Sequence, residues 1–237
     1  NFPNTLTSVG ANAFNNTALE DVTLPSQCVN LQGSCFQDCS KLSVINLSQL
    51  TIISNYAFNA CSSLEYCDGP NSTQGELNLP NLTGTLGNSA FRGCVKLTSI
   101  ASLGSITSIG SSVFENCTQL SNINFPNTLT SVGANAFNNT AWYNNQPNGS
   151  IIINGCVLYA YKGDIIGSYV VPNSILYITD WALNSKSSLT SITLGSGVNY
   201  IMSGAFRYDN NLSTIVVDSN NVKYDSRDNC NAVIETS

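Results

Sequence analysis

The sequence repeats itself over most of its length. Residues 1–18 recur letter for letter as residues 124–141, so the two copies are 123 residues apart. A shorter period lies within this offset, because an apolar site filled by phenylalanine or, at Leu183, by leucine returns about every 23 residues. Its phenylalanines are Phe14, Phe36, Phe58, Phe91, Phe114, Phe137 and Phe206. A period of about 20 to 50 residues is typical of solenoids, in which each repeat forms one coil.

Other apolar positions keep the same period. Five residues before the phenylalanine site stand aliphatic residues such as Val9, Leu31 and Ile53, and further upstream lie tracts such as 120–125 and 189–194. In these tracts apolar residues alternate with Ser, Thr or Asn, as in a strand with one buried face. A single coil cannot bury its apolar edge, but stacked coils can. We therefore predict a leucine-rich-repeat type of solenoid: a parallel β-sheet of short strands on one face, with turns, 3₁₀ or helical turns on the other.

The combined motif is Leu-x-x-Ile-x-Leu-Pro followed by Ser-Ile-Gly-x-x-Ala-Phe-x-x-Cys. It resembles the BspA-like leucine-rich repeats, which occur mostly in bacterial cell-surface proteins, and the resemblance covers essentially the whole chain. Residues 141–147 and 159–163 resemble an insertion common in these proteins, and 224–236 resembles the start of a further family segment. The resemblance implies surface display or secretion, adhesion, and binding of host or matrix proteins.

Two insertions interrupt the period within what we predict to be one solenoid domain, residues 1–237. Residues 65–75 are expected to form a loop before a regular strand at 76–79. Residues 142–168 contain Asn154-Gly155 between two β-rich runs, which is a strong signal for a β-hairpin because both turn residues must accept positive φ. We expect this hairpin to stand off the solenoid. Because the chain begins in mid-repeat, we also expect it to be a fragment of a longer protein.

The composition excludes several classes of function. Charged residues make up only 9% of the chain, the net charge is −6 and the eight basic residues are scattered, whereas nucleic-acid binding needs clustered Lys and Arg. No apolar run approaches the ~18 residues of a membrane span. The chain has no histidine, which removes the usual general base and a common metal ligand. We therefore predict a protein that is not an enzyme and has no cofactor.

Nine cysteines raise the question of a metal or disulfide site. Four of them follow the phenylalanine site by three residues, so they are predicted to form a column, which cannot converge on zinc as a tetrahedral site requires. Buried, reduced thiols are the favoured interpretation. A Cys28–Cys35 disulfide requires that the two Cβ atoms face each other, and the cysteines in irregular segments are the better candidates for exposure or pairing. The column is Cys39, Cys61, Cys94 and Cys117, and the irregular ones are Cys67, Cys156 and Cys230.

An acidic and amide-rich cluster near the C-terminus is the other candidate for metal binding. Calcium accepts such oxygen ligands, but the expected ligand alternation with glycine is missing, so turn and capping roles are favoured. The cluster consists of Asp218, Asn220, Asn221, Asp225 and Asp228.

Two surfaces are candidates for binding a partner. The first is the strand face, meaning the outward side of the predicted strands, which is small, neutral and suited to weak, repeated contacts. Its candidate residues are Glu20, Asp21, Thr23, Asn46, Thr98, Ser121, Asn122, Asn124, Thr190 and Thr193. The second is the 142–168 insertion, where Tyr159 and Tyr161 share one side of a strand that is expected to be exposed. Four other aromatic residues nearby are expected to pack inside: Trp142, Tyr143, Tyr177 and Trp181.

These observations favour a non-enzymatic adhesion or binding module that recognises extracellular or host proteins. A structural spacer that projects other domains is one alternative, and a glycan-binding module that uses Tyr159 and Tyr161 is another.

Overall fold

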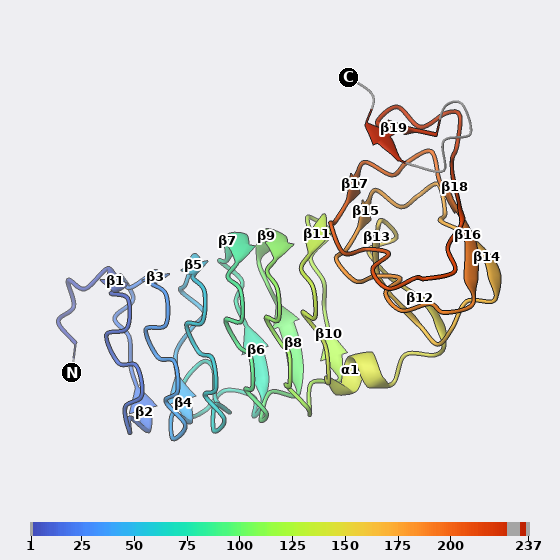
Figure 1. The fold of residues 1–237 in the computed structure, drawn as a ribbon. Helices are drawn as coiled ribbons and strands as arrows, with labels where there is room; N and C mark the ends of the chain where they lie inside the picture. Colours follow the sequence, from blue (N-terminus) through green and yellow to red (C-terminus); the bar gives the residue numbers. More distant parts are fainter. Residues whose placement is uncertain (1, 227–232, 236–237) are drawn as a thin grey trace. The chain divides into compact units, whose positions relative to one another are not determined.

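The computed structural model describes residues 2–226 and 233–235 and divides the chain into two compact units, residues 1–145 and 146–237. The sequence predicts one continuous solenoid. Because the structure has two compact units, each unit is described by itself. Both are built of coils that carry short parallel strands, as Figure 1 shows. The predicted fold class, a leucine-rich-repeat solenoid, is confirmed.

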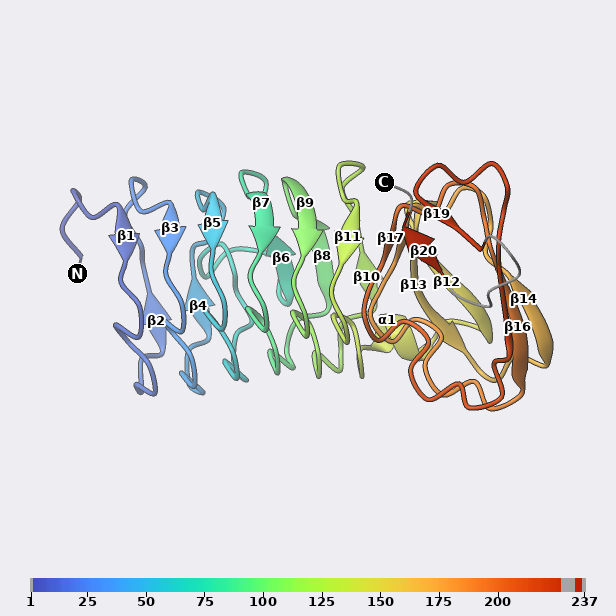
Figure 2. The ribbon, with the colours of Figure 1, turned by 45° about the horizontal axis from the view of Figure 1, so that its top comes forward.

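The N-terminal unit carries two lines of parallel strands (Figure 2). One line forms the strand face: β2 (Asp21–Val22), β4 (Val44–Ile45), β6 (Glu76–Asn78), β8 (Ser99–Ser102) and β10 (Asn122–Ile123). The second line lies at the aliphatic position before each phenylalanine: β1 (Ser8–Val9), β3 (Asn30–Leu31), β5 (Ile52–Ile53), β7 (Thr83–Leu86), β9 (Ser105–Ile109) and β11 (Ser131–Val132). This second line replaces part of the turn structure that the periodicity predicted.

The phenylalanines of successive coils stack in the core of this unit. From Phe14 to Phe137 the ring centroids are 5.2–5.7 Å apart and the rings are nearly parallel. Offset stacks of this kind stabilise a core beyond simple burial of area. Backbone hydrogen bonds join the same coils, for example from Phe36 N to Ala57 O at 2.9 Å. After the last stacked ring, Thr140 caps the N-terminus of α1 (Ala141–Asn144), and its side chain accepts a hydrogen bond from Tyr143 N.

In the N-terminal unit, each turn around a phenylalanine from Phe14 to Phe137 contains left-handed residues two positions before and two positions after it. In the first coil these are Asn12 (φ 58°) and Asn16 (φ 56°), and the identical copy repeats them at Asn135 (φ 57°) and Asn139 (φ 59°). Asn tolerates this conformation better than other residues with a side chain. The two identical sequences therefore have the same turn conformation.

The C-terminal unit contains two larger sheets and a small terminal pair. The first sheet has the order β12 (Gly149–Ile153), β13 (Val157–Lys162), β15 (Tyr177–Ile178), β17 (Tyr200–Ile201). The second has the order β14 (Gly167–Val170), β16 (Leu189–Leu194), β18 (Thr214–Val217) and carries the residues predicted for the strand face in this unit, Thr190 and Thr193. β19 (Tyr224–Asp225) pairs with β20 (Ile234–Glu235). A core of buried aliphatic side chains that includes Leu183, Ile192 and Leu194 lies between the two larger sheets.

The structure corrects the expected position of the hairpin. β12 and β13 pair antiparallel around Asn154 (φ 51°) and Gly155 (φ 70°), as the Asn-Gly signal predicts. However, β13 also pairs in parallel with β15 through Val157–Tyr177 and Leu158–Ile178. The second hairpin strand is therefore a strand of the solenoid itself, and the hairpin does not stand off it.

The segment 65–75 is only partly a loop. Tyr66 forms a parallel bridge with Val44, so the start of the segment pairs with β4 like a further short strand. Cys67 is fully buried. The chain then turns at Gly69 and Pro70 before β6 begins at Glu76, the predicted start of the strand.

Candidate functional site

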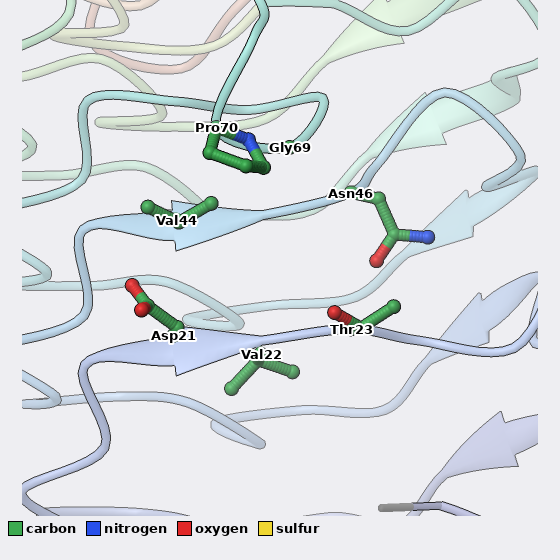
Figure 3. A pocket seen from close by; sticks show the side chains of 7 residues that line it. All are labelled: Asp21, Val22, Thr23, Val44, Asn46, Gly69 and Pro70. Carbon is green, nitrogen blue, oxygen red and sulfur yellow. The ribbon is translucent and has the colours of Figure 1, made fainter.

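A hollow of about 330 Å³ opens on the strand face of the N-terminal unit (Figure 3). It lies at the lower end of the usual range for ligand pockets, about 300–1,000 Å³. Three of the residues that line it, Asp21, Thr23 and Asn46, are among those predicted for this face. The full lining is Asp21, Val22, Thr23, Val44, Asn46, Gly69 and Pro70.

Two paired strands form the floor of the hollow. β2 and β4 are in register with Asp21 beside Val44 and Val22 beside Ile45. Because side chains alternate along a strand, Asp21 is exposed while Val22 is almost buried. Asn46 fixes the far end, since its Nδ2 donates to Leu24 O at 2.9 Å and its Oδ1 accepts from Leu24 N at 2.7 Å. The amide of Asn46 is thus used in holding two coils together.

The 65–75 segment supplies the wall of the hollow. Asn46 and Asp68 form an antiparallel bridge, and Ser48 N donates to Asp68 Oδ1 at 3.3 Å. The chain turns at Gly69, whose φ of 86° suits glycine, and Ser72 Oγ donates to Gly69 O at 2.8 Å. The turn therefore holds Pro70 next to the side chain of Val44, as Figure 3 shows.

The lining of the hollow is suited to binding and lacks a catalytic arrangement. Val22, Val44 and Pro70 present carbon atoms, while Asp21 and Thr23 place oxygen atoms at the rim. The lining contains no Cys, Lys or second carboxylate, and the chain has no histidine. Such a surface can hold an apolar side chain and accept a hydrogen bond beside it.

The other residues predicted for the strand face all reach the surface. Glu20, Ser121, Asn122, Asn124 and Thr190 are exposed, whereas Thr98 and Thr193 are half-buried. Many of their polar groups are engaged in holding coils together. Ser121 Oγ donates to Thr98 O at 3.4 Å, Asn124 Nδ2 to Ala101 O at 3.0 Å, and Thr190 Oγ1 to Gly167 O at 3.0 Å. Much of the neutral polar surface thus has a structural role.

The tyrosines of the insertion do not form the expected exposed surface. Tyr159 is only 5% exposed, and the half-buried Tyr161 packs on the core of the C-terminal unit with its ring 5.4 Å from that of Tyr169. In β13, residues 157–159 are buried and residues 160–162 are half-buried. The expectation of an exposed pair at Tyr159 and Tyr161 is therefore wrong.

The aromatic residues expected to pack inside divide into two groups. Trp142 and Tyr143 are half-buried, and the Trp142 ring packs edge-on against Phe125 and Phe137. Tyr177 is also half-buried, but Trp181 is 43% exposed, contrary to expectation.

The cysteine column has the predicted position and is fully buried. Each thiol donates to the carbonyl oxygen of the phenylalanine in the preceding coil, for example from Cys39 Sγ to Phe14 O at 2.9 Å and from Cys94 Sγ to Phe58 O at 3.2 Å. Burial raises the pKa of the Cys117 thiol to about 12 and has the same direction of effect on the pKa of Cys61 and Cys94.

The remaining cysteines differ from expectation in part. Cys28 and Cys35 are both buried and unbridged. Cys67, a candidate for exposure or pairing, is fully buried and unbridged, and burial raises its pKa to about 12. Cys156 is half-buried. Cys230 lies outside the described residues.

In the cluster near the C-terminus, Asp218, Asn220 and Asn221 form turns, while Asp225 lies in β19. Asp218 Oδ1 accepts from Asn220 N and Nδ2 at 2.8 and 3.0 Å, and Asn221 Oδ1 accepts from Tyr224 N at 2.8 Å. These are the local bonds by which Asp and Asn stabilise turns. Asp228 lies outside the described residues.

The sequence analysis missed four lining residues: Val22, Val44, Gly69 and Pro70. The Gly-Pro pair was a signal for a turn, but the direction of that turn over the strand face depends on the bonds of Asp68 and Ser72. Across residues 2–226 and 233–235, no helix has the length and apolar character needed to span a membrane.

Comparison with solved structures shows similar folds. A leucine rich cell surface protein from Faecalibacterium prausnitzii A2-165 is 22% identical with a TM-score of 0.54, and the match covers 98% of this chain and 76% of that one. The pneumococcal vaccine antigen PcpA is 23% identical (TM-score 0.49, 90% and 56%). A leucine-rich repeat protein from Bacteroides ovatus ATCC 8483 is 20% identical (TM-score 0.41), and this chain spans 59% of its length. At these sequence identities the similarity shows the fold alone. This conclusion depends on the Faecalibacterium prausnitzii protein, which has the TM-score of 0.54.

A search of curated proteins gives no match. The sequence profile described as the BspA type leucine rich repeat region (6 copies) matches residues 1–75, 71–152 and 147–233, which together span nearly the whole chain. The chain therefore belongs to the BspA-type leucine-rich repeat family.

Proposed function

We propose that this chain is a non-enzymatic binding module, displayed at the cell surface or secreted, which recognises a segment of an extracellular or host protein through the strand face of its N-terminal unit. One apolar side chain of the partner enters the hollow between β2, β4 and the turn at Gly69-Pro70. The hollow carries this proposal. Membership of a repeat family with many surface proteins supports the location, as does the description of the Faecalibacterium prausnitzii protein as a cell surface protein.

The chemistry of the hollow selects the kind of partner side chain. Val22, Val44 and Pro70 offer apolar contact, which favours an aliphatic or aromatic group. Asp21 at the rim favours a partner with a hydrogen-bond donor or positive charge beside that group. The other residues predicted for the strand face are mostly uncharged Ser, Thr and Asn, so this anchor is expected to supply most of the binding free energy.

Substitution of Val44 by lysine tests the proposal. The longer side chain fills the hollow and places a charge in it, so the apolar anchor of the partner is excluded. Ser99→Lys is the matched control, because Ser99 occupies the same register position on β8, away from the hollow. Binding of the purified chain to immobilised fibronectin, fibrinogen, collagen and mucin is measured by surface plasmon resonance.

We expect saturable binding to at least one of these proteins, weakened at least about tenfold by Val44→Lys and unchanged by Ser99→Lys, since loss of one buried apolar side chain costs about 1.5–3 kcal/mol. Equal binding by Val44→Lys and Ser99→Lys would show that the hollow is not part of the interface. Absence of binding to all four proteins by folded wild-type chain would favour the alternative of a structural spacer.

A further inference from the structure

A second hollow, of about 450 Å³, lies in the C-terminal unit at the turns that follow β15 and β17. It is independent of the site proposed above, since all its residues belong to residues 146–237. Its lining combines an indole ring, a carboxylate, a hydroxyl and a guanidinium group. The lining residues are Asp180, Trp181, Ser203, Gly204, Phe206 and Arg207.

Trp181 occupies an unfavourable backbone position without the benefit of burial. Its φ is 64°, and the same position of the repeat is filled by Asn12, Ser34, Tyr56 and Asn135 in the N-terminal unit. A bulky side chain at positive φ is strained, yet 43% of the Trp181 side chain remains exposed. Neither backbone preference nor core packing therefore accounts for tryptophan at this position, and its exposed indole is available to a ligand in the hollow.

The Asp180 carboxylate has an acceptor that no group of the protein uses. Its Oδ1 atom is buried and has no hydrogen-bond partner. At the same position of earlier repeats, Asn55 Oδ1 accepts from Asn88 N and Asn88 Oδ1 accepts from Ser111 N, both at 2.8 Å. Buried acceptors are rarely left unpaired, because their desolvation is unfavourable. Asp180 also lines the hollow, so its carboxylate places negative charge at this surface.

Gly204 brings the carboxylate and the indole together. A Cβ atom at this residue would lie 2.0 Å from Asp180 Oδ1 and 2.7 Å from Trp181 Cδ1. Any side chain at this position would therefore displace both groups. Because glycine stands here, the backbone of the β17 coil lies directly against the carboxylate and one edge of the indole.

The charges of the hollow are balanced. Its lining contains the positively charged Arg207 and the negatively charged Asp180. The Arg207 guanidinium is 4.7 Å from the centre of the Tyr208 ring. A site with one carboxylate and one guanidinium does not favour a strongly charged ligand of either sign. It instead offers an acceptor and a planar set of donors for a neutral ligand with several hydroxyl groups.

Further aromatic surface lies on the same two strands. Tyr177 and Tyr200 are partners in the β15–β17 register with ring centroids 5.9 Å apart, and Tyr200 is 62% exposed. The Tyr177 hydroxyl donates to Met202 Sδ at 3.0 Å, and Met202 is 39% exposed. In the N-terminal unit the corresponding position holds mostly small residues such as Ser8, Ser108 and Ser131.

We propose that this hollow binds a neutral saccharide. The C–H groups of one sugar face lie on the exposed indole of Trp181, a sugar hydroxyl donates to the Asp180 carboxylate, and Arg207 donates to sugar oxygen atoms. Carbohydrates combine an apolar C–H face with hydroxyl groups at its edge, and the hollow presents the complementary arrangement of a ring and polar groups. Tyr177 and Tyr200 provide a surface along which further sugar units of a longer chain extend.

Trp181→Asn is the sharpest test, because asparagine is found at this left-handed position in other coils and relieves the strain. The variant is expected to be at least as stable as the wild type and to lose saccharide binding. Tyr56→Asn is the matched control: Tyr56 has the same repeat position in the N-terminal unit, a φ of 62° and 45% exposure. Asp180→Ala is the second variant, since Ala11 and Ala134 occupy the position of Asp180 in other coils.

The probes are cellohexaose, maltohexaose, xylohexaose, chitohexaose and mannohexaose, each titrated to about 10 mM by calorimetry and tryptophan fluorescence. We expect at least one to bind and to change the tryptophan emission. Trp181→Asn should abolish both signals, Asp180→Ala should weaken binding at least about tenfold, and Tyr56→Asn should leave it unchanged.

Two outcomes would overturn the proposal. One is the absence of binding by all five oligosaccharides to folded wild-type chain. The other is binding that survives Trp181→Asn, which would place the saccharide elsewhere. A lysine-rich peptide is titrated in parallel, and its binding to the wild type but not to Trp181→Asn, with no oligosaccharide bound, would assign the hollow to a cationic peptide instead.

Discussion

At the scale of single residues, the buried thiols join neighbouring coils as well as filling space. Each thiol of the column donates to a carbonyl oxygen of the preceding coil, so it satisfies a backbone acceptor inside the core. Thr140 stands at the next position of the column, where its hydroxyl also donates to a backbone carbonyl, that of Phe137. The position three residues after the phenylalanine therefore requires a small side chain with one hydrogen-bond donor.

The raised thiol pKa values predict a fall in stability at alkaline pH. Burial raises the pKa of Cys35, Cys67 and Cys117 from 9.0 to about 12. Below pH 9 these thiols are protonated in both states, whereas above it they ionise only in the unfolded chain, so the free energy of unfolding falls from pH 9 towards pH 12. Each thiol should contribute a loss of about 1.4 kcal/mol by pH 10.

Urea unfolding at pH 8 and pH 10 measures this loss. Other groups also titrate in this range, so Cys117→Thr serves as the reference. The variant should lose about 1.4 kcal/mol less than the wild type between the two pH values. Equal losses in the two proteins would show that the Cys117 thiol ionises in the folded state.

At the scale of structural elements, the turn at Asn154-Gly155 is expected to depend on backbone conformation alone. Gly155 has a φ of 70°, and a Cβ atom there would meet nothing within 4 Å. Gly155→Ala should therefore lower the free energy of unfolding of the C-terminal unit by about 1 kcal/mol, through strain without a clash. Gly10→Ala is the control, since Gly10 has equal space and is not among the glycines with positive φ.

Thermal or urea unfolding of the two variants gives the comparison. Gly10→Ala should be neutral or slightly stabilising, because alanine restricts the unfolded chain. A Gly155→Ala variant as stable as Gly10→Ala would mean that the hairpin turn does not hold the left-handed conformation.

The elements that the sequence predicted well are those determined by short-range spacing. The phenylalanine column, the strand face and the Asn154-Gly155 turn all follow from residues within one or two repeats. Tyr159 could not be placed in this way, because its burial depends on the pairing of β13 with β15. The hollow at Val44 depends in turn on hydrogen bonds between the 65–75 segment and β4. Both features depend on contacts between different segments of the chain. The local sequence pattern of either segment does not specify these contacts.

At the scale of the whole molecule, the division into two compact units predicts that residues 1–145 fold alone. This fragment contains the complete phenylalanine stack, together with α1 and the Trp142 ring that packs on Phe137. In repeat proteins, stability arises mainly from contacts between neighbouring coils. The fragment should therefore unfold in one cooperative transition.

Trp142 is the only tryptophan of this fragment and reports on its fold. We expect blue-shifted emission that moves to the red at the same urea concentration at which the far-UV circular dichroism is lost. Emission typical of exposed tryptophan in the absence of urea, or a gradual change without a midpoint, would contradict independent folding of the unit.

The identical turns at Asn12–Asn16 and Asn135–Asn139 bear on how such a protein changes over evolutionary time. They belong to copies 123 residues apart, an interval of five complete coils. Recombination between the two copies would delete or duplicate those five coils at once. At the junction, each repeat position would stack on the same repeat position of the next coil. The core contacts would therefore stay unchanged. The length of this solenoid is therefore a property that a lineage can alter in a single event, while the shape of each coil is conserved.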